Sequence, residues 1–408
     1  MEILKKLVKK DIKSKIVLIV LDGVGDLPVK DDKTPLELAK TPNLDKLSQR
    51  SATGLHIPVD LGITPGSGPG HLGLFGYEPL KLEIGRGILE ALGVGLDVRE
   101  TDVAIRGNFA TVRYEGERPI VIDRRAGRIP TEENKRIITK IAEKIKKIDE
   151  AEVILCSGRE HRFSLILRFP HKVTPHAERV NDTDPQATGK SPLLPQGETP
   201  EAEKVASIAK KFIEVTADIL RDEPKANYVL LRGFSVKPDI EPFPLKFGLR
   251  SACIAVYPMY KGLARLVDMD VITFEGETFE DELRVLREWW ESYDFFFIHV
   301  KKTDSYGEDG NFEGKVKVIE DFDAHLPEVL ALKPEVLAIT GDHSTPCVMK
   351  SHSWHPVPVL INSPYVLGGL SQRFTERECF KGELGLFPSY KLMPLLLAHA
   401  LRLQKYGA

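Results

Sequence analysis

The sequence predicts an α/β protein built on a central, mostly parallel sheet flanked by helices. Short apolar segments of strand length alternate along the chain with longer segments of helical periodicity. Three of the apolar segments are followed within a few residues by a carboxylate, at the strand ends where α/β sheets usually build their sites. The 408 residues exceed one ordinary hydrophobic core. We therefore expect two domains, and insertion of one into the other is one such arrangement.

The apolar segments give the strands that we expect. They cover residues 16–21, 153–156, 228–232, 253–256, 295–300 and 336–340. Helical periodicity covers residues 1–13, 131–148, 201–220 and 279–290, and the last two open with acidic residues that suit a helix N-terminus. Residues 181–200 are polar and rich in proline, which predicts a loop.

Composition narrows the class of protein. The 57 basic and 60 acidic residues nearly balance, so no general attraction to nucleic acid or to a membrane surface is expected. The four cysteines lie far apart and form no CxxC pair, which argues against a disulfide framework or a thiolate zinc site. The first apolar run, residues 16–21, is too short to span a membrane. These features predict a cytoplasmic protein.

The strongest site signal is Gly341-Asp342-His343-Ser344, which follows the apolar run at 336–340. A buried strand that ends in adjacent Asp and His residues indicates a metal site. Asp22 directly follows the run at 16–21, and Asp304 comes shortly after the run at 295–300. Since parallel strands end at one edge of a sheet, three such endings favour one shared site.

Ser67 stands in a segment with glycine at three nearby positions and proline at two, between residues 64 and 72. Such a turn leaves the hydroxyl accessible, and the residues from His71 onward can begin a helix. Taken alone, the segment is more often a simple turn. The carboxylates and imidazole described above add weight, because a serine hydroxyl needs a base or a metal to become nucleophilic near neutral pH.

Further candidate ligands lie in two loops. Asp304 and Glu308 are four residues apart in a glycine-containing segment that we expect to form a turn, and they can converge on one cation. His352 and His355 precede another apolar run. Each of these residues is unremarkable alone, since acidic loops are usually solvated and loop histidines usually bind no metal.

The order of the motifs along the chain resembles that of the alkaline-phosphatase superfamily and, within it, of the cofactor-independent phosphoglycerate mutases of the archaeal type. The motifs are Asp22-Gly23, Gly66-Ser67, Lys302-Thr303-Asp304, Gly341-Asp342-His343 and His352-Ser353. The resemblance spans nearly the whole chain. Further matching segments are residues 41–45, 86–93, 106–110, 123–128 and 261–265.

The resemblance implies two divalent metal ions and a nucleophilic serine, Ser67, that becomes phosphoserine. One ion would be held by Asp22, Ser67, Asp342 and His343, and the other by Asp304, Glu308 and His352. Many relatives carry histidine where this chain has Glu308. The additional carboxylate should favour harder ions, Mn²⁺ first, with Mg²⁺ or Co²⁺ as alternatives, over Zn²⁺. His355 stays open as a substitute ligand.

A phosphoglycerate substrate would need a basic pocket, and arginine binds phosphate and carboxylate in bidentate fashion. The candidates are Arg124, Arg125, Arg128, Arg162, Arg232 and Lys261. Any single arginine among them is as easily a surface residue. Asp123 is a candidate general base for the hydroxyl group of the substrate.

The fold implied is an alkaline-phosphatase-like core at residues 1–100 and 246–408, with a smaller α/β substrate-binding domain inserted at 101–245. The implied reaction interconverts 3-phosphoglycerate and 2-phosphoglycerate in glycolysis and gluconeogenesis, without bisphosphoglycerate. A metal-dependent phosphomonoesterase, another phosphomutase or a small-molecule kinase on the same core stays open. The expected partner is the small-molecule substrate, with no nucleic acid and no membrane; assembly into a homo-oligomer is left open.

Overall fold

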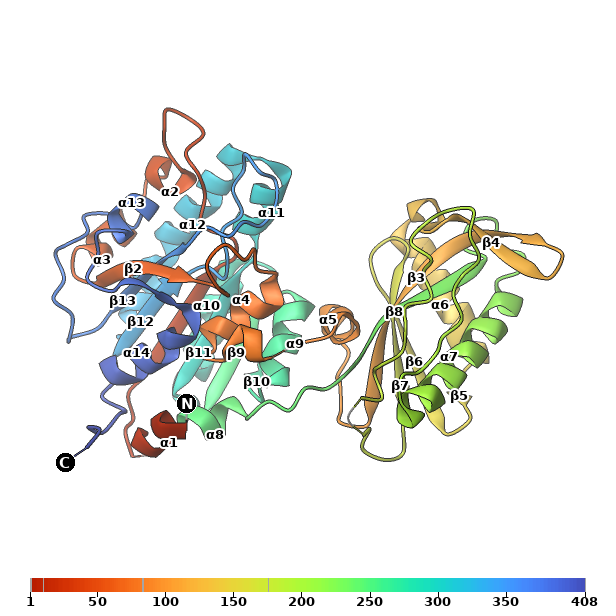
Figure 1. Ribbon diagram of the computed structural model, residues 1–408. Helices are drawn as coiled ribbons and strands as arrows, with labels where there is room; N and C mark the ends of the chain where they lie inside the picture. Colours follow the sequence, from red (N-terminus) through yellow and green to blue (C-terminus); the bar gives the residue numbers. More distant parts are fainter. Residues whose placement is uncertain (1, 10, 83, 175, 408) are drawn as a thin grey trace. The chain divides into compact units, whose positions relative to one another are not determined.

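The computed structural model describes residues 2–9, 11–82, 84–174 and 176–407 (Figure 1). The chain forms two compact units: unit 1 comprises Met1–Leu82 and Ile240–Ala408, and unit 2 comprises Glu83–Asp239. The sequence placed the boundaries later, at 100/101 and 245/246. Helix α5 (Arg86–Gly93) accounts for much of the difference, because it packs against strands β3 (Asp102–Glu115) and β8 (Tyr228–Val236) of unit 2.

Unit 1 is built on an eight-stranded sheet with the order β10-β9-β11-β1-β12-β13-β2-β14. Its strands are β1 (Ile16–Leu21), β2 (Ala52–Ile57), β9 (Ser251–Ala255), β10 (Asp270–Val271), β11 (Phe295–Val300), β12 (Val336–Thr340), β13 (Val357–Asn362) and β14 (Gly385–Pro388). Strand β1 pairs in parallel with both β11 and β12, so that Ile16 lies opposite Phe295 on one side and Val336 on the other. Strand β13 is antiparallel to both neighbours. The prediction of a mostly parallel central sheet is confirmed.

The helices of unit 1 flank this sheet (Figure 1). They are α1 (Glu2–Leu7), α2 (Pro35–Leu38), α3 (Pro42–Ser48), α4 (Ser67–Leu74), α8 (Phe243–Phe247), α9 (Pro258–Leu266), α10 (Phe279–Trp289), α11 (Lys302–Asp309), α12 (Phe312–Ala331), α13 (Glu376–Cys379) and α14 (Leu392–His399), with 3-10 turns η1 (Pro79–Lys81) and η3 (Ser389–Lys391). The first helix ends well before residue 13. Residues 302–309, expected as a turn, form a helix. Within the described ranges, no helix is both long and apolar enough to cross a membrane.

Strand β1 is covered on both faces. All six of its residues are fully buried, so both of its faces are covered, as parallel sheets require. Val17, Ile19 and Leu21 pack into one hydrophobic cluster with side chains of α10 and α12. Neither face of β1 contacts solvent, and its C-terminal end is buried as well, since Leu21 and the following Asp22 are both fully buried.

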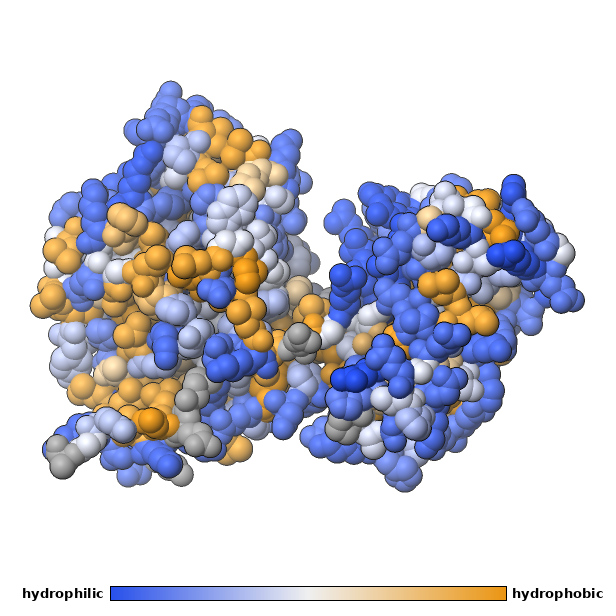
Figure 2. All heavy atoms as spheres, viewed as in Figure 1, coloured by the Kyte–Doolittle hydropathy of each residue, from blue (hydrophilic) through white to orange (hydrophobic). Residues whose placement is uncertain are grey.

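Unit 2 contains a second sheet, and every strand pairing in it is antiparallel. Its strands are β3, β4 (Arg118–Asp123), β5 (Lys147–Ile148), β6 (Ala151–Ser157), β7 (Arg162–Arg168) and β8, and its helices are α5, α6 (Thr131–Lys144) and α7 (Pro200–Ile219), with the 3-10 turn η2 (Ala126–Arg128). Apolar residues of α6 and α7 share one core with the sheet. The surface of unit 2 that is visible in Figure 2 is mostly hydrophilic. Strand and helix alternation alone does not specify strand direction.

Lys315 of α12 is a fully buried cation that joins two loops of unit 1. Its ammonium group donates to the carbonyl oxygens of Gly23 and Thr345, both at 2.9 Å, and pairs with Asp26 Oδ2 at 2.8 Å. The loop after β1 and the loop after β12 are therefore fixed to each other and to α12. The buried charge is tolerated because acceptors satisfy its N–H groups.

Replacing Lys315 by methionine should destabilise unit 1 by about 3–5 kcal/mol, because it leaves the Asp26 carboxylate buried without its partner. Urea unfolding followed by tryptophan fluorescence reports on this unit, since all three tryptophans lie in it: Trp289, Trp290 and Trp354. Lys317→Met, at an exposed position of the same helix, should change the stability by no more than about 0.5 kcal/mol. Equal unfolding midpoints for the two variants would contradict the stabilising role of Lys315 between the two loops.

Candidate metal centre and arginine pocket

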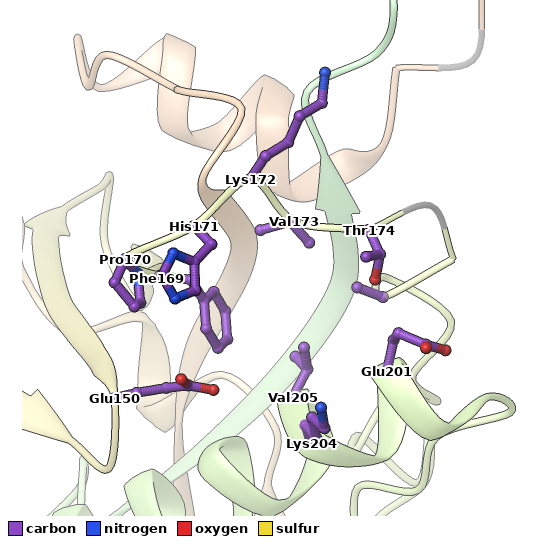
Figure 3. Close-up of a pocket in the computed structure, with 11 residues that line it drawn as sticks. Glu150, Phe169, Pro170, His171, Lys172, Val173, Thr174, Glu201, Lys204 and Val205 are labelled. Carbon is purple, nitrogen blue, oxygen red and sulfur yellow. The ribbon is translucent and has the colours of Figure 1, made fainter.

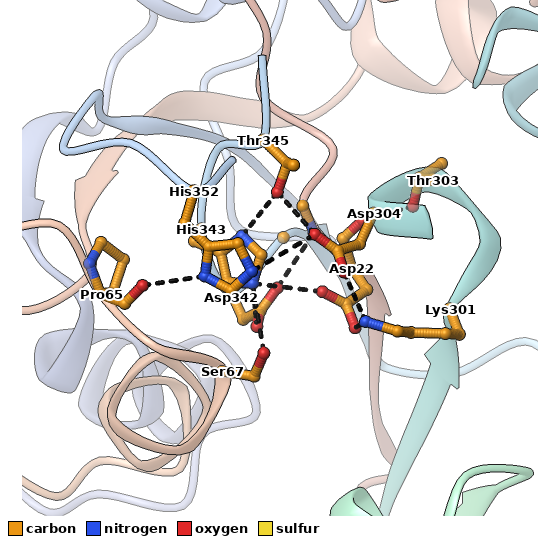
Figure 4. Close-up of polar contacts among 12 residues, drawn as sticks. Asp22, Pro65, Ser67, Lys301, Thr303, Asp304, Asp342, His343, Thr345 and His352 are labelled. Atoms are coloured by element: carbon orange, nitrogen blue, oxygen red, sulfur yellow. Dashed lines mark hydrogen bonds and ion pairs between the residues drawn. The ribbon is translucent and has the colours of Figure 1, made fainter. Parts of the chain in front are cut away.

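Three neighbouring strands deliver acidic side chains to one edge of the unit 1 sheet. Asp22 follows β1, Asp342 and His343 follow β12, and Asp304 lies in the first turn of α11, just after β11. The parallel register of β1 with both neighbours places these strand ends side by side. All four side chains are buried, and Figure 4 shows them turned toward a common centre.

Asp22, Asp342 and His343 form the first group of candidate ligands, with one potential ligand atom from each within 4.8 Å of the others. His343 Nε2 lies 3.3 Å from Asp22 Oδ1 and 3.1 Å from Asp342 Oδ2. Ser67 Oγ is 3.4 Å from the same nitrogen. The structure thus brings together the four residues that the sequence assigned to one ion.

Asp304, His343 and His352 form the second group. His352 Nε2 lies 3.5 Å from Asp304 Oδ1 and 3.8 Å from Glu308 Oε1. The Glu308 side chain is 55% exposed, so it stands at the rim of the group. The sequence assigned His343 to one ion, whereas its position lets it serve either, with its ring stacked 3.6 Å from that of His352.

The hydrogen bonds around the two imidazoles determine which ring nitrogens are free. Thr345 Oγ1 donates to Asp304 Oδ1 at 2.7 Å, so it accepts the proton of His343 Nδ1 at 2.9 Å. His352 Nδ1 donates to the Pro65 carbonyl oxygen at 2.9 Å. Both Nε2 atoms therefore present lone pairs toward the carboxylates, the orientation of metal-binding histidines.

The donor set fits a divalent cation. Asp22 Oδ1 and Asp342 Oδ2 are buried, and no described residue donates a hydrogen bond to them. Burial raises the pKa of the Asp22 carboxyl, but the contact with His299 and the charge of Lys301 hold it well below its usual range. Charged oxygens that lack donors and face imidazole lone pairs are costly unless a cation binds them.

Lys301 is an additional cation of the site that the sequence did not reveal. Its ammonium group lies 3.0 Å from Asp22 Oδ2 and also pairs with Asp304 (Figure 4). Although burial lowers the pKa of Lys301, the two carboxylates raise it above its usual value. Its position just before the Lys302-Thr303-Asp304 segment could have indicated a place in the site. A lysine in a charged segment, however, is usually solvated.

Three more buried residues surround the first group, and the sequence assigned them no role. His299 Nε2 lies 3.2 Å from Asp22 Oδ2, and the Tyr260 hydroxyl donates to the same carboxylate. His71 Nδ1 lies 3.2 Å from Asp342 Oδ2 and 2.8 Å from the Ser67 carbonyl oxygen. His71 and His299 stand in otherwise apolar segments, where a lone His usually belongs to the core, and Tyr260 lies in a helix that also contains Lys261 and Arg265.

Ser67 is the first residue of α4, and Gly66 is its extended N-cap. Helix α4 lies very close to the loop after β12, because a Cβ on Gly70 would sit 2.6 Å from the Asp342 carbonyl oxygen. Only glycine permits this approach, which brings Ser67 beside His343. No side chain caps this helix among the described residues, so the N–H groups of its first turn suit an anion.

Unit 2 contains a separate basic pocket of about 330 Å³. Five of the six predicted substrate-binding residues line it: Arg124, Arg125, Arg128, Arg162 and Arg232. The sixth, Lys261, lies in α9 of unit 1. Arg106, Asn108 and His161 also line this arginine pocket, together with Glu160 and Asp184.

Two of the arginines are bound to a carboxylate. Arg124 makes a bidentate pair with Asp184, with distances of 2.7 and 2.8 Å, and Arg232 approaches the same carboxylate at 3.2 Å. Burial raises the pKa of Asp184, but the hydrogen bond and charge of Arg124 outweigh this effect, so the pKa lies below its usual value. Among the described residues, no carboxylate pairs with Arg125, Arg128 or Arg162. These three arginines are available for a ligand.

Asp123, the candidate general base, holds a turn. Its two carboxylate oxygens accept the backbone N–H groups of Arg125 at 2.8 Å and of Gly127 at 2.7 Å. Such bonds fix the 3-10 turn η2, in which Gly127 has a φ of +62°. Asp123 therefore orients the arginine-bearing turn, and proton transfer would cost it these bonds.

Unit 2 has another pocket, of about 200 Å³, between the segment after β7 and helix α7. Apolar side chains, among them Phe169 and Val205, share its lining with Glu150 and Lys204 (Figure 3). The described residues that line it include none of the predicted site residues. We assign it no part in the chemistry.

Comparison with known proteins identifies the family. Residues 14–399 match the metalloenzyme superfamily. Over 408 residues, the full length of both chains, the sequence is 68% identical to a probable 2,3-bisphosphoglycerate-independent phosphoglycerate mutase of Aquifex aeolicus. The chain belongs to this family of phosphoglycerate mutases. A protein of the same name from Thermus thermophilus is 54% identical and covers 100% of this chain, with 99% of its own length aligned.

Solved structures agree with this family membership. A cofactor-independent phosphoglycerate mutase from Thermoplasma acidophilum is 30% identical, with a TM-score of 0.77 over 95% of this chain and 100% of its own. A protein from Pyrococcus horikoshii is 33% identical, with a TM-score of 0.80 over 97% and 100%. The family resemblance and the α/β fold class predicted from the sequence are both confirmed.

Because both ligand groups share His343, His343→Ala should abolish most of the stabilisation of unit 1 by Mn²⁺. A ligand present at 100 times its Kd adds roughly 2.7 kcal/mol per site, which calorimetry detects as a rise in Tm. His355→Ala should retain the rise, because His355 Nδ1 contacts Ser353 Oγ and belongs to neither group. An unchanged rise in His343→Ala, or its loss in His355→Ala, would show that the ligands are assigned wrongly.

Proposed function

We propose that this chain interconverts 3-phosphoglycerate and 2-phosphoglycerate through a phosphoserine at Ser67, without bisphosphoglycerate, in glycolysis and gluconeogenesis. The observation that carries this proposal is the position of Ser67 Oγ, 3.4 Å from His343 Nε2, at a helix N-terminus beside a buried carboxylate cluster. Mutases related over the full length of the chain support the choice of substrate. The free cysteine thiols suit a cytoplasmic location.

Two divalent cations would be held by the residues that the sequence nominated. One would take Asp22, Ser67, Asp342 and His343, and the other Asp304, Glu308 and His352, with His343 within reach of both. Four carboxylates in the set favour hard ions such as Mn²⁺. When bound, the ions would lower the pKa of the serine hydroxyl and neutralise charge on the phosphoryl group.

The chain's own residues then account for the transfer. Ser67 Oγ loses its proton and forms a bond to phosphorus, and the bond between phosphorus and the glycerate oxygen breaks. The glycerate oxygen takes up one proton in turn and leaves as a hydroxyl group. The N–H groups at the start of α4 favour the phosphoryl oxygens. Lys301 adds a positive charge between Asp22 and Asp304, which offsets the negative charge of the ionised serine.

A mutase must also retain glycerate until its other hydroxyl group takes the phosphoryl group back. Arg125, Arg128 and Arg162 have the charge to hold a carboxylate or phosphate, and Arg124 and Arg232 are kept in place by Asp184. A phosphomonoesterase needs no site that retains the alcohol. The arginine pocket therefore favours the mutase over that alternative.

Ser67→Ala should lower the formation of 2-phosphoglycerate by at least about 10³-fold and remove any side hydrolysis of the substrate, because both reactions start with the same attack. In the wild-type chain, acid quenching during turnover followed by mass spectrometry should find one phosphoryl group on the peptide that contains Ser67. Ser207→Ala, at an exposed position of α7, should behave as wild type. Turnover that persists in Ser67→Ala would exclude the phosphoserine route.

A further inference from the structure

The arginine pocket contains polar atoms that no described residue satisfies. Asn108 Oδ1 and His161 Nδ1 are buried without a hydrogen-bond partner among the described residues, and both residues line the pocket. Asn108 is 5% exposed and His161 is 4% exposed. Buried polar groups in native proteins are nearly always paired. Two unpaired atoms in one cavity indicate that a ligand completes their bonds.

Strand register explains how these groups converge. Arg106 and Asn108 are two residues apart along β3, so both side chains lie on one face of the sheet. Arg106 stands opposite Arg232 on β8, and Asn108 stands opposite Arg162 on β7. Directly opposed residues share a face. The backbone N–H of Phe109 donates to the His161 carbonyl oxygen at 2.8 Å, which fixes His161 beside this face.

His161 is a neutral group among cations. Burial lowers its pKa to about 4, and the charges of Arg162, Arg125 and Arg106 contribute, with Glu160 opposing them. At neutral pH the imidazole is therefore uncharged. Its Nδ1 lies 3.9 Å from Glu160 Oε2, too far for a hydrogen bond.

The chemistry of the free atoms selects a functional group. Arginines only donate hydrogen bonds, so they suit the oxygens of a carboxylate or phosphate. Asn108 Oδ1 can only accept, and a neutral imidazole nitrogen accepts or donates according to its tautomer. A hydroxyl group both donates and accepts. Asn108 and His161 therefore complement an alcohol, whereas the arginines complement the anion attached to it.

We propose that Asn108 and His161 form a hydroxyl-binding subsite in the arginine pocket, which selects hydroxy acids over otherwise identical acids that lack the hydroxyl group. The inference rests on the proposed function for the identity of the hydroxy acid, glycerate or its phosphate. A site that hydrogen-bonds a hydroxyl group discriminates strongly against an analogue without it, because its polar groups are then left buried and unpaired.

The test is calorimetric binding to the full chain in a Ser67→Ala background, which prevents turnover, with Mn²⁺ present. The two probes are 3-phosphoglycerate and the phosphate monoester of 3-hydroxypropionate, here called 3-phosphopropionate, which has the same anionic groups but lacks the 2-hydroxyl group. Without a further change, 3-phosphoglycerate should bind about tenfold more tightly or better. Adding Asn108→Ala should weaken 3-phosphoglycerate by about tenfold and leave the affinity for 3-phosphopropionate unchanged within about twofold.

Two control variants make the result specific. Arg125→Ala should weaken both probes alike, because it removes an anion contact only. His161→Phe keeps a ring of similar volume and should reduce the preference for 3-phosphoglycerate, which protects the test if Asn108→Ala unfolds. Equal affinity for the two probes before any pocket substitution, equal weakening of both by Asn108→Ala, or no binding of either probe would overturn the proposal.

The outcome also separates this inference from the proposed function. Loss of the hydroxyl preference, with 3-phosphoglycerate turnover by the wild-type chain intact, would remove the subsite alone. A wild-type chain that prefers 3-phosphoglycerate over 3-phosphopropionate but does not turn it over would retain the subsite and remove the mutase assignment.

Discussion

The parallel pairing of β1 with β11 and β12 is the constraint on which the rest of unit 1 depends. It places Asp22, Asp304 and Asp342 together in a buried volume, where like charges repel strongly and solvent cannot screen them. Lys301 offsets part of this repulsion. Two of these carboxylate oxygens still lack a hydrogen-bond donor among the described residues. The fold thus concentrates negative charge that bound cations would neutralise.

Much of the neighbouring structure holds this charge in place. Lys315 joins the loops after β1 and β12, and Gly70 allows α4 to approach the second of these loops. Thr345 links His343 to Asp304, so the two ligand groups are connected by hydrogen bonds even before any ion binds. This arrangement also places Ser67 Oγ beside His343 Nε2.

The sequence predicted what depends on local pattern. The run at 16–21 and the following Asp22 gave both the strand and its acidic end, and helix 279–290 was found to within one residue of its observed end. The sequence did not predict the features that depend on contacts between distant parts of the chain. Strand direction in unit 2, the position of His343 between the groups, and the turn-forming role of Asp123 arise from contacts between distant residues. Lys301, His299 and Tyr260 resemble ordinary surface or core residues until the strands are assembled.

In the proposed function, the carboxylate cluster of unit 1 serves the phosphoryl transfer and the arginine pocket of unit 2 retains glycerate. The central step of the proposed reaction is that Ser67 passes the phosphoryl group back to glycerate. The most direct measurement is ³¹P NMR of the wild-type chain with Mn²⁺ and 3-phosphoglycerate, in the absence of bisphosphoglycerate. We predict that 2-phosphoglycerate appears as the main product, with little inorganic phosphate. Inorganic phosphate as the main product, or no conversion, would contradict the account.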